Sequence, residues 1–195
     1  AIAAAAMQVI KNENAILLVL SADHVIGDKE AFHHAINIAI RHAQSQKLVT
    51  FGVPPESPNT EYGYIKLSSE EEWGGFKVEE FTEKPNKNEA LSYIKHGNYL
   101  WNSGMFVFQA DTLIKELAIH SSDILYSVSK SVDLGQQDLD FIRLEKKSFE
   151  SSPSDSIDYA LMEKSSNVVV VPLKSGWNDL GSWSALYDVN AKDNH

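Results

Sequence analysis

The sequence contains no cysteine, and it has only 17 lysine and arginine residues against 27 aspartate and glutamate residues. The absence of cysteine excludes disulfide bonds and thiolate metal sites. The net charge of −10 at pH 7 argues against a nucleic-acid partner, because a phosphate-backbone binder needs a face rich in lysine and arginine. Any anionic ligand must therefore be held by local groups: a metal ion, one or two lysines, or backbone N–H groups.

Long hydrophobic runs are also lacking. No stretch approaches the roughly 20 apolar residues that are needed to span a bilayer, so we expect no membrane partner. The hydrophobic share of 43% and the charged share of 23% are ordinary for a globular protein. At 195 residues, we expect a single domain over residues 1–195, and the lack of cysteine suits a cytoplasmic location.

Residues 1–7 read Ala-Ile-Ala-Ala-Ala-Ala-Met, which is unusual for the start of a domain. The segment is apolar on every side and no capping residue precedes it, as is typical of the middle of a buried helix. It also lacks the basic start and the cleavage site of a signal peptide. We therefore expect that an N-terminal part of the domain is missing from this sequence.

The periodicity of apolar residues predicts alternating strands and helices. The apolar run 16–20 predicts a strand, the helical spacing over 29–46 after a capping Asp28 predicts a helix, and 48–53 predicts the next strand. Strand, helix and strand in this order form a βαβ unit. We further predict strands at 62–67, 76–82, 99–108 and 168–173, helices at 87–96, at 111–120 and from about 182, and a mostly helical stretch over 121–165. The expected fold is α/β, with a mixed, mostly parallel sheet flanked by helices.

Two acidic turns lie directly after predicted strands. Asp23 follows the strand 16–20, and Asp179 follows the valine run 168–171 within Trp-Asn-Asp-Leu-Gly-Ser-Trp (177–183). Open α/β sheets bind ligands at such strand ends. Two converging carboxylates would bind Mg²⁺, because it prefers hard oxygen ligands and bridges to phosphate oxygens. Taken alone, each aspartate is more simply explained as closing a turn by a bond to its own backbone.

Glu83-Lys84-Pro85 ends a predicted strand with adjacent opposite charges. Neighbours in a strand point to opposite faces, and Pro85 keeps Lys84 out of helical geometry, so the two charges are not expected simply to pair. A carboxylate can accept two sugar hydroxyls, and an ammonium group can neutralise a phosphate. The simpler alternative is a solvated strand end.

Three other segments interrupt the predicted elements with small or polar residues. Gly63, between two tyrosines, indicates a bulge or a backbone that a ligand approaches closely. Asn102 begins Asn-Ser-Gly inside an otherwise aromatic strand, which indicates a turn or a contact. Asp158, in Ser-Ile-Asp-Tyr-Ala (156–160), could simply lie at the capped start of a helix.

These motifs are individually weak, but their order is specific. In sequence they are Asp-His after a strand, Glu-Tyr-Gly-Tyr-Ile, Glu-Lys-Pro, Asn-Ser-Gly-Met-Phe, Ser-Ile-Asp-Tyr-Ala and Trp-Asn-Asp-Leu-Gly-Ser-Trp. In this order the chain resembles, over essentially its whole length, the sugar-phosphate nucleotidyltransferases. Within them it is most similar to the bacterial mannose-1-phosphate guanylyltransferases that are often fused to a mannose-6-phosphate isomerase domain. The resemblance implies a Rossmann-like nucleotidyltransferase fold.

The resemblance also implies residue roles. Asp23 and Asp179 match the aspartates that bind Mg²⁺, and with Lys84 they form the implied catalytic set. Glu83 matches the acid that holds sugar hydroxyls, and Lys84 matches the base that meets the sugar phosphate. Further substrate-binding positions are implied for three residues: Gly63 through its backbone, Asn102, and Asp158 in a matching segment.

The activity implied by the resemblance is transfer of a guanylyl group from GTP to mannose 1-phosphate, giving GDP-mannose and pyrophosphate. Members carry an N-terminal glycine-rich loop, G-x-G-T/S-R-L-x-P, which does not occur in this sequence. We therefore expect the N-terminal nucleotide-binding part to be missing and residues 1–195 to be inactive alone. The alternatives are a nucleotidyltransferase for another hexose 1-phosphate, a nucleotide-sugar glycosyltransferase, or a non-catalytic sugar-nucleotide-binding module. Homo-oligomerisation stays open.

Overall fold

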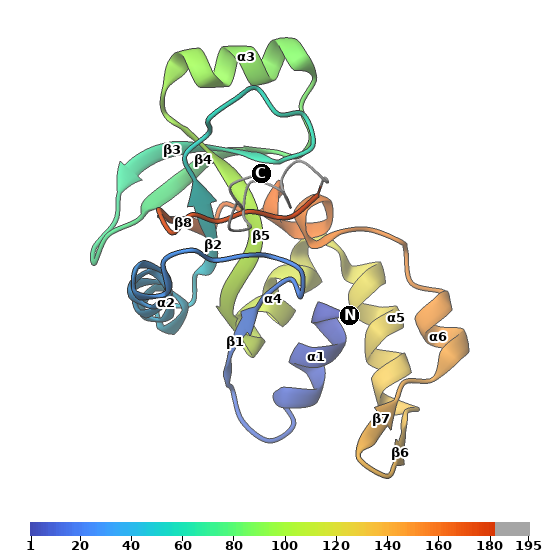
Figure 1. The fold of residues 1–195 in the computed structure, drawn as a ribbon. Coiled ribbons are helices and arrows are strands. Elements are labelled where there is room, and N and C mark those ends of the chain that lie inside the picture. The colour runs from blue at the N-terminus through green and yellow to red at the C-terminus, as the bar shows by residue number, and fades with distance from the viewer. Residues whose placement is uncertain (182–195) are drawn as a thin grey trace, which may run out of the picture.

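The computed structural model describes residues 1–181, and its longest strand, β5 (Tyr99–Gln109), lies at the centre of the fold (Figure 1). A six-stranded sheet has the order β1-β5-β2-β8-β4-β3. The other strands are β1 (Ile16–Val19), β2 (Leu48–Val53), β3 (Tyr64–Glu70), β4 (Phe76–Thr82) and β8 (Val168–Pro172). The first residues of β5 also pair with β3, so β5, β2, β8, β4 and β3 close into a barrel.

The α/β class and the mixed sheet are confirmed, but the prediction of a mostly parallel sheet is wrong. Within the described residues only β2 and β8 pair in parallel, and every other pairing of this sheet is antiparallel. One reason is that β3 and β4 are joined by a five-residue turn, 71–75, and a turn of that length permits only antiparallel strands. A second reason is that β5 lies between β1 and β2 and is antiparallel to both. The predicted βαβ unit of β1, α2 and β2 therefore has another strand inserted between its two strands.

Helices cover both faces of the sheet (Figure 1). Helix α2 (Lys29–Gln44) lies on one side and begins at Asp28, whose side chain accepts a hydrogen bond from the Ala31 backbone N–H at 2.9 Å. Its buried alanines pack against β2, β5 and β8. Helices α1 (Ile2–Val9), α4 (Ala110–His120) and α5 (Ser122–Asp133) lie on the other side. Residues 1–7 thus form a helix as predicted, with Ala3, Ala4 and Ala6 buried.

Helix α3 (Lys87–His96) covers the mouth of the barrel and is bounded as predicted. It starts at Asn86, which forms a capping box with Glu89, and it ends at Gly97, whose φ of 73° is in the left-handed region that favours glycine. Its inner face packs on a buried aromatic cluster of three residues from β3 and β5: Tyr64, Tyr99 and Trp101.

The stretch 121–165 is only partly helical. It contains α5, the short helix α6 (Lys146–Glu150) and a π-helix, η1 (Asp158–Met162), but also a hairpin of β6 (Gln136–Asp138) and β7 (Phe141–Arg143) that the helical pattern did not predict. The helix predicted from about residue 182 lies outside the described residues.

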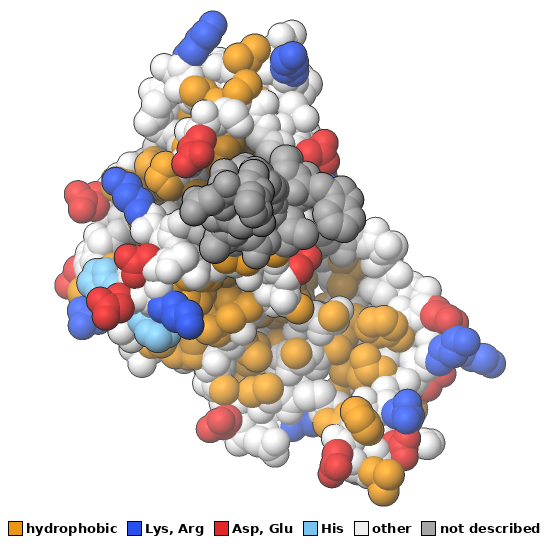
Figure 2. Space-filling view, viewed as in Figure 1, with side chains coloured by type: hydrophobic (Ala, Val, Ile, Leu, Met, Phe, Trp, Pro, Cys, Tyr) orange, Lys and Arg blue, Asp and Glu red, His pale blue; other side chains and the backbone are white. Residues whose placement is uncertain are grey.

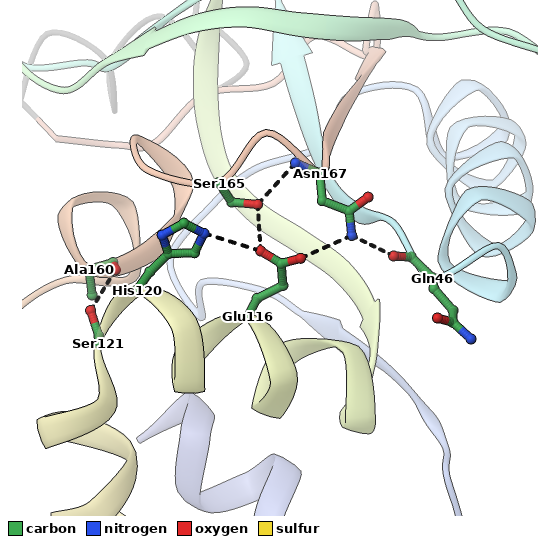
Figure 3. A network of polar contacts seen from close by, with 7 residues as sticks. All are labelled: Gln46, Glu116, His120, Ser121, Ala160, Ser165 and Asn167. Carbon is green, nitrogen blue, oxygen red and sulfur yellow. Dashed lines mark hydrogen bonds and ion pairs between the residues drawn. The ribbon is translucent and has the colours of Figure 1, made fainter.

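A polar network attaches the start of β8 to α4 (Figure 3). Glu116 accepts hydrogen bonds from the Ser165 hydroxyl at 2.7 Å and from the Asn167 amide at 3.3 Å, and the His120 ring lies 3.5 Å from the same carboxylate. The Asn167 amide also donates to the Gln46 carbonyl at 2.7 Å. A hydrolytic triad needs the histidine between the serine and the acid. Here the acid lies between them, so the network is a structural tie.

The surface agrees with the acidic composition. On the face shown in Figure 2, lysine and arginine side chains are scattered among acidic ones, and hydrophobic side chains gather over the helices of the lower half. Within residues 1–181, no helix combines the length and the apolar character that crossing a membrane requires.

Candidate functional site

The two acidic turns lie side by side in the structure. The backbone N–H of Val25 donates to the Asn178 carbonyl at 2.8 Å, and the N–H of Asn178 donates back to the Val25 carbonyl at 3.0 Å. This bridge is antiparallel, so the segment before Val25 and the segment after Asn178 leave the bridge on the same side. Asp23, two residues before Val25, and Asp179, one residue after Asn178, both lie on that side. Convergence across about 155 residues of sequence is therefore present at the level of the backbone, whereas metal binding by the pair stays a prediction.

Side chains reinforce this junction. The Trp177 indole N–H donates to His24 Nδ1 at 3.1 Å, and the two rings meet edge to face with centroids 5.3 Å apart. The Tyr62 ring packs against Trp177 on one side and Trp101 on the other, at centroid distances of 5.5 and 5.0 Å. The junction is thereby attached to the barrel through β5.

Tyr62 also orients Asp179. Its hydroxyl donates to Asp179 Oδ1 at 2.9 Å, and the Gly181 N–H donates to the same oxygen at 3.2 Å. Burial, followed by the hydrogen bond and the charge of Asp179, raises the pKa of Tyr62, so the phenol remains a donor at neutral pH. Within residues 1–181, both of these hydrogen bonds are to Oδ1, and none is to Asp179 Oδ2. The sequence analysis assigned no role to Tyr62, although its place directly before Gly63 marked the segment.

The Glu83 side chain packs directly against the backbone of Gly63. A Cβ at this position would overlap Glu83 Oε2 and would lie 3.2 Å from the Asn102 Cβ. The Gly63 carbonyl also accepts a hydrogen bond from the Asn102 N–H at 2.8 Å. The group that approaches this glycine closely in the structure is the Glu83 carboxylate, whereas the approach of a ligand to the Gly63 backbone stays a prediction.

Glu83 is an unsatisfied acid. Its Oε2 is buried and has no hydrogen-bond partner within the described residues. Burial raises the pKa of Glu83 to about 7, and the negative charges of Asp158 and Glu163 act in the same direction. The positive charge of Lys84 opposes this rise. A buried polar atom without a partner calls for an explanation. A solvated strand end does not provide one, because only Lys84 is exposed there.

Asn102 lies in a bulge of β5. The register between β2 and β5 shifts between Thr50 and Gly52, and Gly104 has a φ of 69°. The Asn102 Oδ1 accepts from the Thr50 hydroxyl at 2.9 Å, and its amide donates to Asp158 Oδ1 at 2.9 Å. The sequence indicated either a turn or a contact at this segment. In the structure Asn102 lies at an irregularity of the backbone and also contacts Thr50 and Asp158.

Asp158 is the first residue of η1, so its predicted place at a helix start is confirmed, although the helix is of the π type. Burial raises the pKa of Asp158, and the hydrogen bond from Asn102 opposes that shift. The carboxylates of Glu83 and Asp158 are near enough for the charge of Asp158 to raise the pKa of Glu83. Asn102, Asp158 and Glu83 therefore line one polar region beside Gly63.

Lys84 has a φ of 48°, in the left-handed region that a lysine rarely adopts. Lys84 is thus outside right-handed helical geometry, as expected for the residue before Pro85, but in a strained conformation rather than an ordinary one. Its side chain is exposed, and its positive charge lowers the pKa of Glu83. Strain of this kind is typical of functional sites.

The model of the nucleotidyl transferase family matches residues 1–195. The chain belongs to this family. A mannose-1-phosphate guanylyltransferase of Salmonella montevideo is 48% identical to this nucleotidyl transferase chain, over all of the chain and 42% of the relative. The nucleotidyl transferase chain thus spans about two fifths of the length of that relative.

Two crystal structures are similar to this nucleotidyl transferase chain. A Thermus thermophilus protein described as mannose-1-phosphate geranyltransferase has a TM-score of 0.85 and 34% identity, over 99% of this chain and 56% of that one. A Helicobacter pylori protein described as mannose-6-phosphate isomerase has a TM-score of 0.83 and 37% identity, over 91% and 68%. At 34% and 37% identity, both likenesses agree with membership of the nucleotidyl transferase family.

Proposed function

We propose that the protein containing this chain transfers a guanylyl group from GTP to mannose 1-phosphate, giving GDP-mannose and pyrophosphate. The observation that carries the proposal is the continuity of the site. Tyr62 binds Asp179, and the adjacent Gly63 packs against Glu83, so the acidic pair and the sugar-binding acid belong to one set of contacts. The similarity to a mannose-1-phosphate guanylyltransferase supports this choice of sugar and base.

The sugar is held by the region around Gly63. Glu83 Oε2, buried and unpartnered within the described residues, accepts sugar hydroxyls as a carboxylate. Asn102 and Asp158, already joined by a hydrogen bond, provide further polar atoms beside it. The exposed ammonium group of Lys84 neutralises the sugar phosphate.

Asp23 and Asp179 would hold Mg²⁺. Within residues 1–181 no three histidine, cysteine, aspartate or glutamate side chains gather as a ligand set, and this fits Mg²⁺, which one or two carboxylates commonly bind together with waters and substrate phosphates. When bound, the ion offsets the negative charge of the phosphates. Tyr62 and Gly181 hold the Asp179 carboxylate in place for it.

In the reaction a phosphate oxygen of mannose 1-phosphate attacks the α-phosphorus of GTP. The new bond forms in line with the bond that breaks, and the β- and γ-phosphates leave as pyrophosphate. Lys84 positions the attacking phosphate, which is a proximity effect. The glycine-rich nucleotide loop of the family resemblance does not occur in residues 1–195, so we expect these residues alone to have little or no transferase activity.

The test is an assay of the full-length protein with GTP, Mg²⁺ and either mannose 1-phosphate or glucose 1-phosphate, following release of pyrophosphate and the sugar nucleotide. We expect GDP-mannose as product. Lys84→Ala should lower kcat/KM for mannose 1-phosphate on the order of 10²-fold, whereas Lys87→Ala, an exposed lysine three residues on, should not.

Other results would contradict the proposal. Preference for glucose 1-phosphate would indicate another hexose-phosphate nucleotidyltransferase. Sugar transfer from GDP-mannose to an acceptor would indicate a glycosyltransferase. Binding of GDP-mannose without any turnover by the full-length protein would indicate a non-catalytic module.

A further inference from the structure

We propose that Glu163 is a positioning residue for the sugar-phosphate site, and that the π-helical turn η1 exists to place it there. This inference rests on the proposed function, because it assigns a role at the same site. The contact that carries it is a hydrogen bond of 2.7 Å from the backbone N–H of Glu83 to Glu163 Oε1. Glu163 thereby holds the main chain at the residue that precedes Lys84.

The π turn explains how residues 158–163 act on both the side chain and the backbone of Glu83. The N–H of Glu163 donates to the Asp158 carbonyl at 3.0 Å, an i→i+5 bond. In an α-helix of 3.6 residues per turn, the fifth residue on is rotated well away from the first. An i→i+5 turn stacks it nearly above the first. Asp158 and Glu163 therefore share a face, one beside the Glu83 carboxylate and the other on the Glu83 backbone.

The charges argue against a purely structural role. The negative charges of Asp158 and Glu163 both oppose ionisation of Glu83, and of the charged groups near Glu83 only Lys84 favours it. A neutral glutamine would accept the same backbone hydrogen bond without adding this repulsion. An arrangement of like charges that costs stability is typical of a site whose missing partner is a ligand.

The backbone beside Glu163 is also strained. Lys84 has a left-handed φ of 48° and is followed by Pro85. Such a conformation persists only where surrounding contacts enforce it. The hydrogen bond from Glu83 to Glu163 is a contact of this kind, adjacent to the strained residue, and it aims the Lys84 side chain at the phosphate that Lys84 is proposed to bind.

The experiment compares Glu163→Ala, which removes the acceptor, with Glu163→Gln, which keeps an acceptor but removes the charge, in the full-length protein. Lys164→Ala, at the next exposed position, is the matched control. Glu163→Ala should raise KM for mannose 1-phosphate about tenfold, as expected for loss of one hydrogen bond to a charged group, with a smaller change in kcat. Glu163→Gln should restore KM.

A second readout follows the charge. Glu83 accepts sugar hydroxyls in its ionised form, so kcat/KM should rise as the pH increases through the pKa of Glu83. The charges of Asp158, Lys84 and Glu163 determine the pH at which this rise occurs. Glu163→Gln removes a negative charge and should shift the rise to lower pH. An unchanged profile would show that the Glu163 charge does not act on Glu83, and it would contradict this part of the inference.

Two further measurements do not need turnover: hydrogen exchange of the Glu83 amide, and the Glu83 carboxyl titration followed by ¹³C NMR. Glu163→Ala should speed the exchange, and Glu163→Gln should lower the titration midpoint. If wild-type protein makes no sugar nucleotide, the proposed function fails, and these two measurements still decide the role of Glu163. If wild-type protein is active and KM, pH profile, exchange and titration are all unaffected, the inference about Glu163 is wrong while the proposed function stands.

Discussion

At the scale of the residue, Gly63 shows most directly how a missing side chain builds the site. A Cβ there would overlap the Glu83 carboxylate rather than backbone, so we expect Gly63→Ala to fold but to displace Glu83. It should raise KM for mannose 1-phosphate and lower the free energy of unfolding. Both effects should come mainly from the contact with Glu83, which is closer than the contact with the Asn102 Cβ.

A double-mutant cycle checks this explanation by urea unfolding. In a Glu83→Ala background, Gly63→Ala should cost little, because the overlapping side chain is gone, and the coupling between the two changes should exceed about 0.5 kcal/mol. Equal costs in both backgrounds would mean that Gly63 is required for another reason.

The residue types were predictable from the sequence, but their partners were not. Glu83, Lys84 and Asn102 were identified because charged and polar residues at strand ends and inside an aromatic strand are costly without a purpose. Nothing in the sequence indicated that Glu163 would bind the backbone of Glu83, because that contact spans 80 residues and depends on a π turn that has no clear sequence pattern.

At the scale of the element, helix α3 depends on its cap. Asn86 accepts hydrogen bonds from the backbone N–H groups of Asn88 and Glu89 at 2.9 and 3.1 Å. Asn86→Ala should therefore lower the free energy of unfolding by about 1 kcal/mol, measured by urea denaturation. Asn88→Ala, in the same exposed first turn, is the control and should be neutral, since alanine is the better helix former. If Asn88→Ala lowered the free energy of unfolding as much as Asn86→Ala does, loss of the cap would not be the cause of the destabilisation.

Elements that depend on local rules were predicted well. Helix α2 starts after the predicted cap Asp28 and ends two residues before its predicted end, and α3 has its predicted bounds, because caps act within a few residues. Strand direction depends instead on which distant segment is the neighbour, and for this reason the antiparallel insertion of β5 was missed. The hairpin of β6 and β7 was missed because its strands have three residues each, too few to show an alternating pattern.

At the scale of the whole molecule, the fold brings together the ends of segments that are remote in sequence. The parallel pair of β2 and β8 carries the chain toward Asp179, while β1 and the following turn carry it toward Asp23. Tyr62, at the entry to β3, joins this junction to the barrel. The family resemblance predicted the site as a set of ordered motifs, and the backbone bridge between Val25 and Asn178 brings two of them side by side.

The central claim is that Asp23 and Asp179 serve one magnesium ion. The most direct measurement is kcat/KM for mannose 1-phosphate, at saturating GTP and Mg²⁺, for full-length Asp23→Asn, Asp179→Asn and the double variant. Each single change should cost on the order of 10²-fold or more, and the double variant should lose about as much as one single change, because residues that act as a unit are strongly non-additive. Undiminished turnover in either single variant, or losses that multiply in the double variant, would contradict the account.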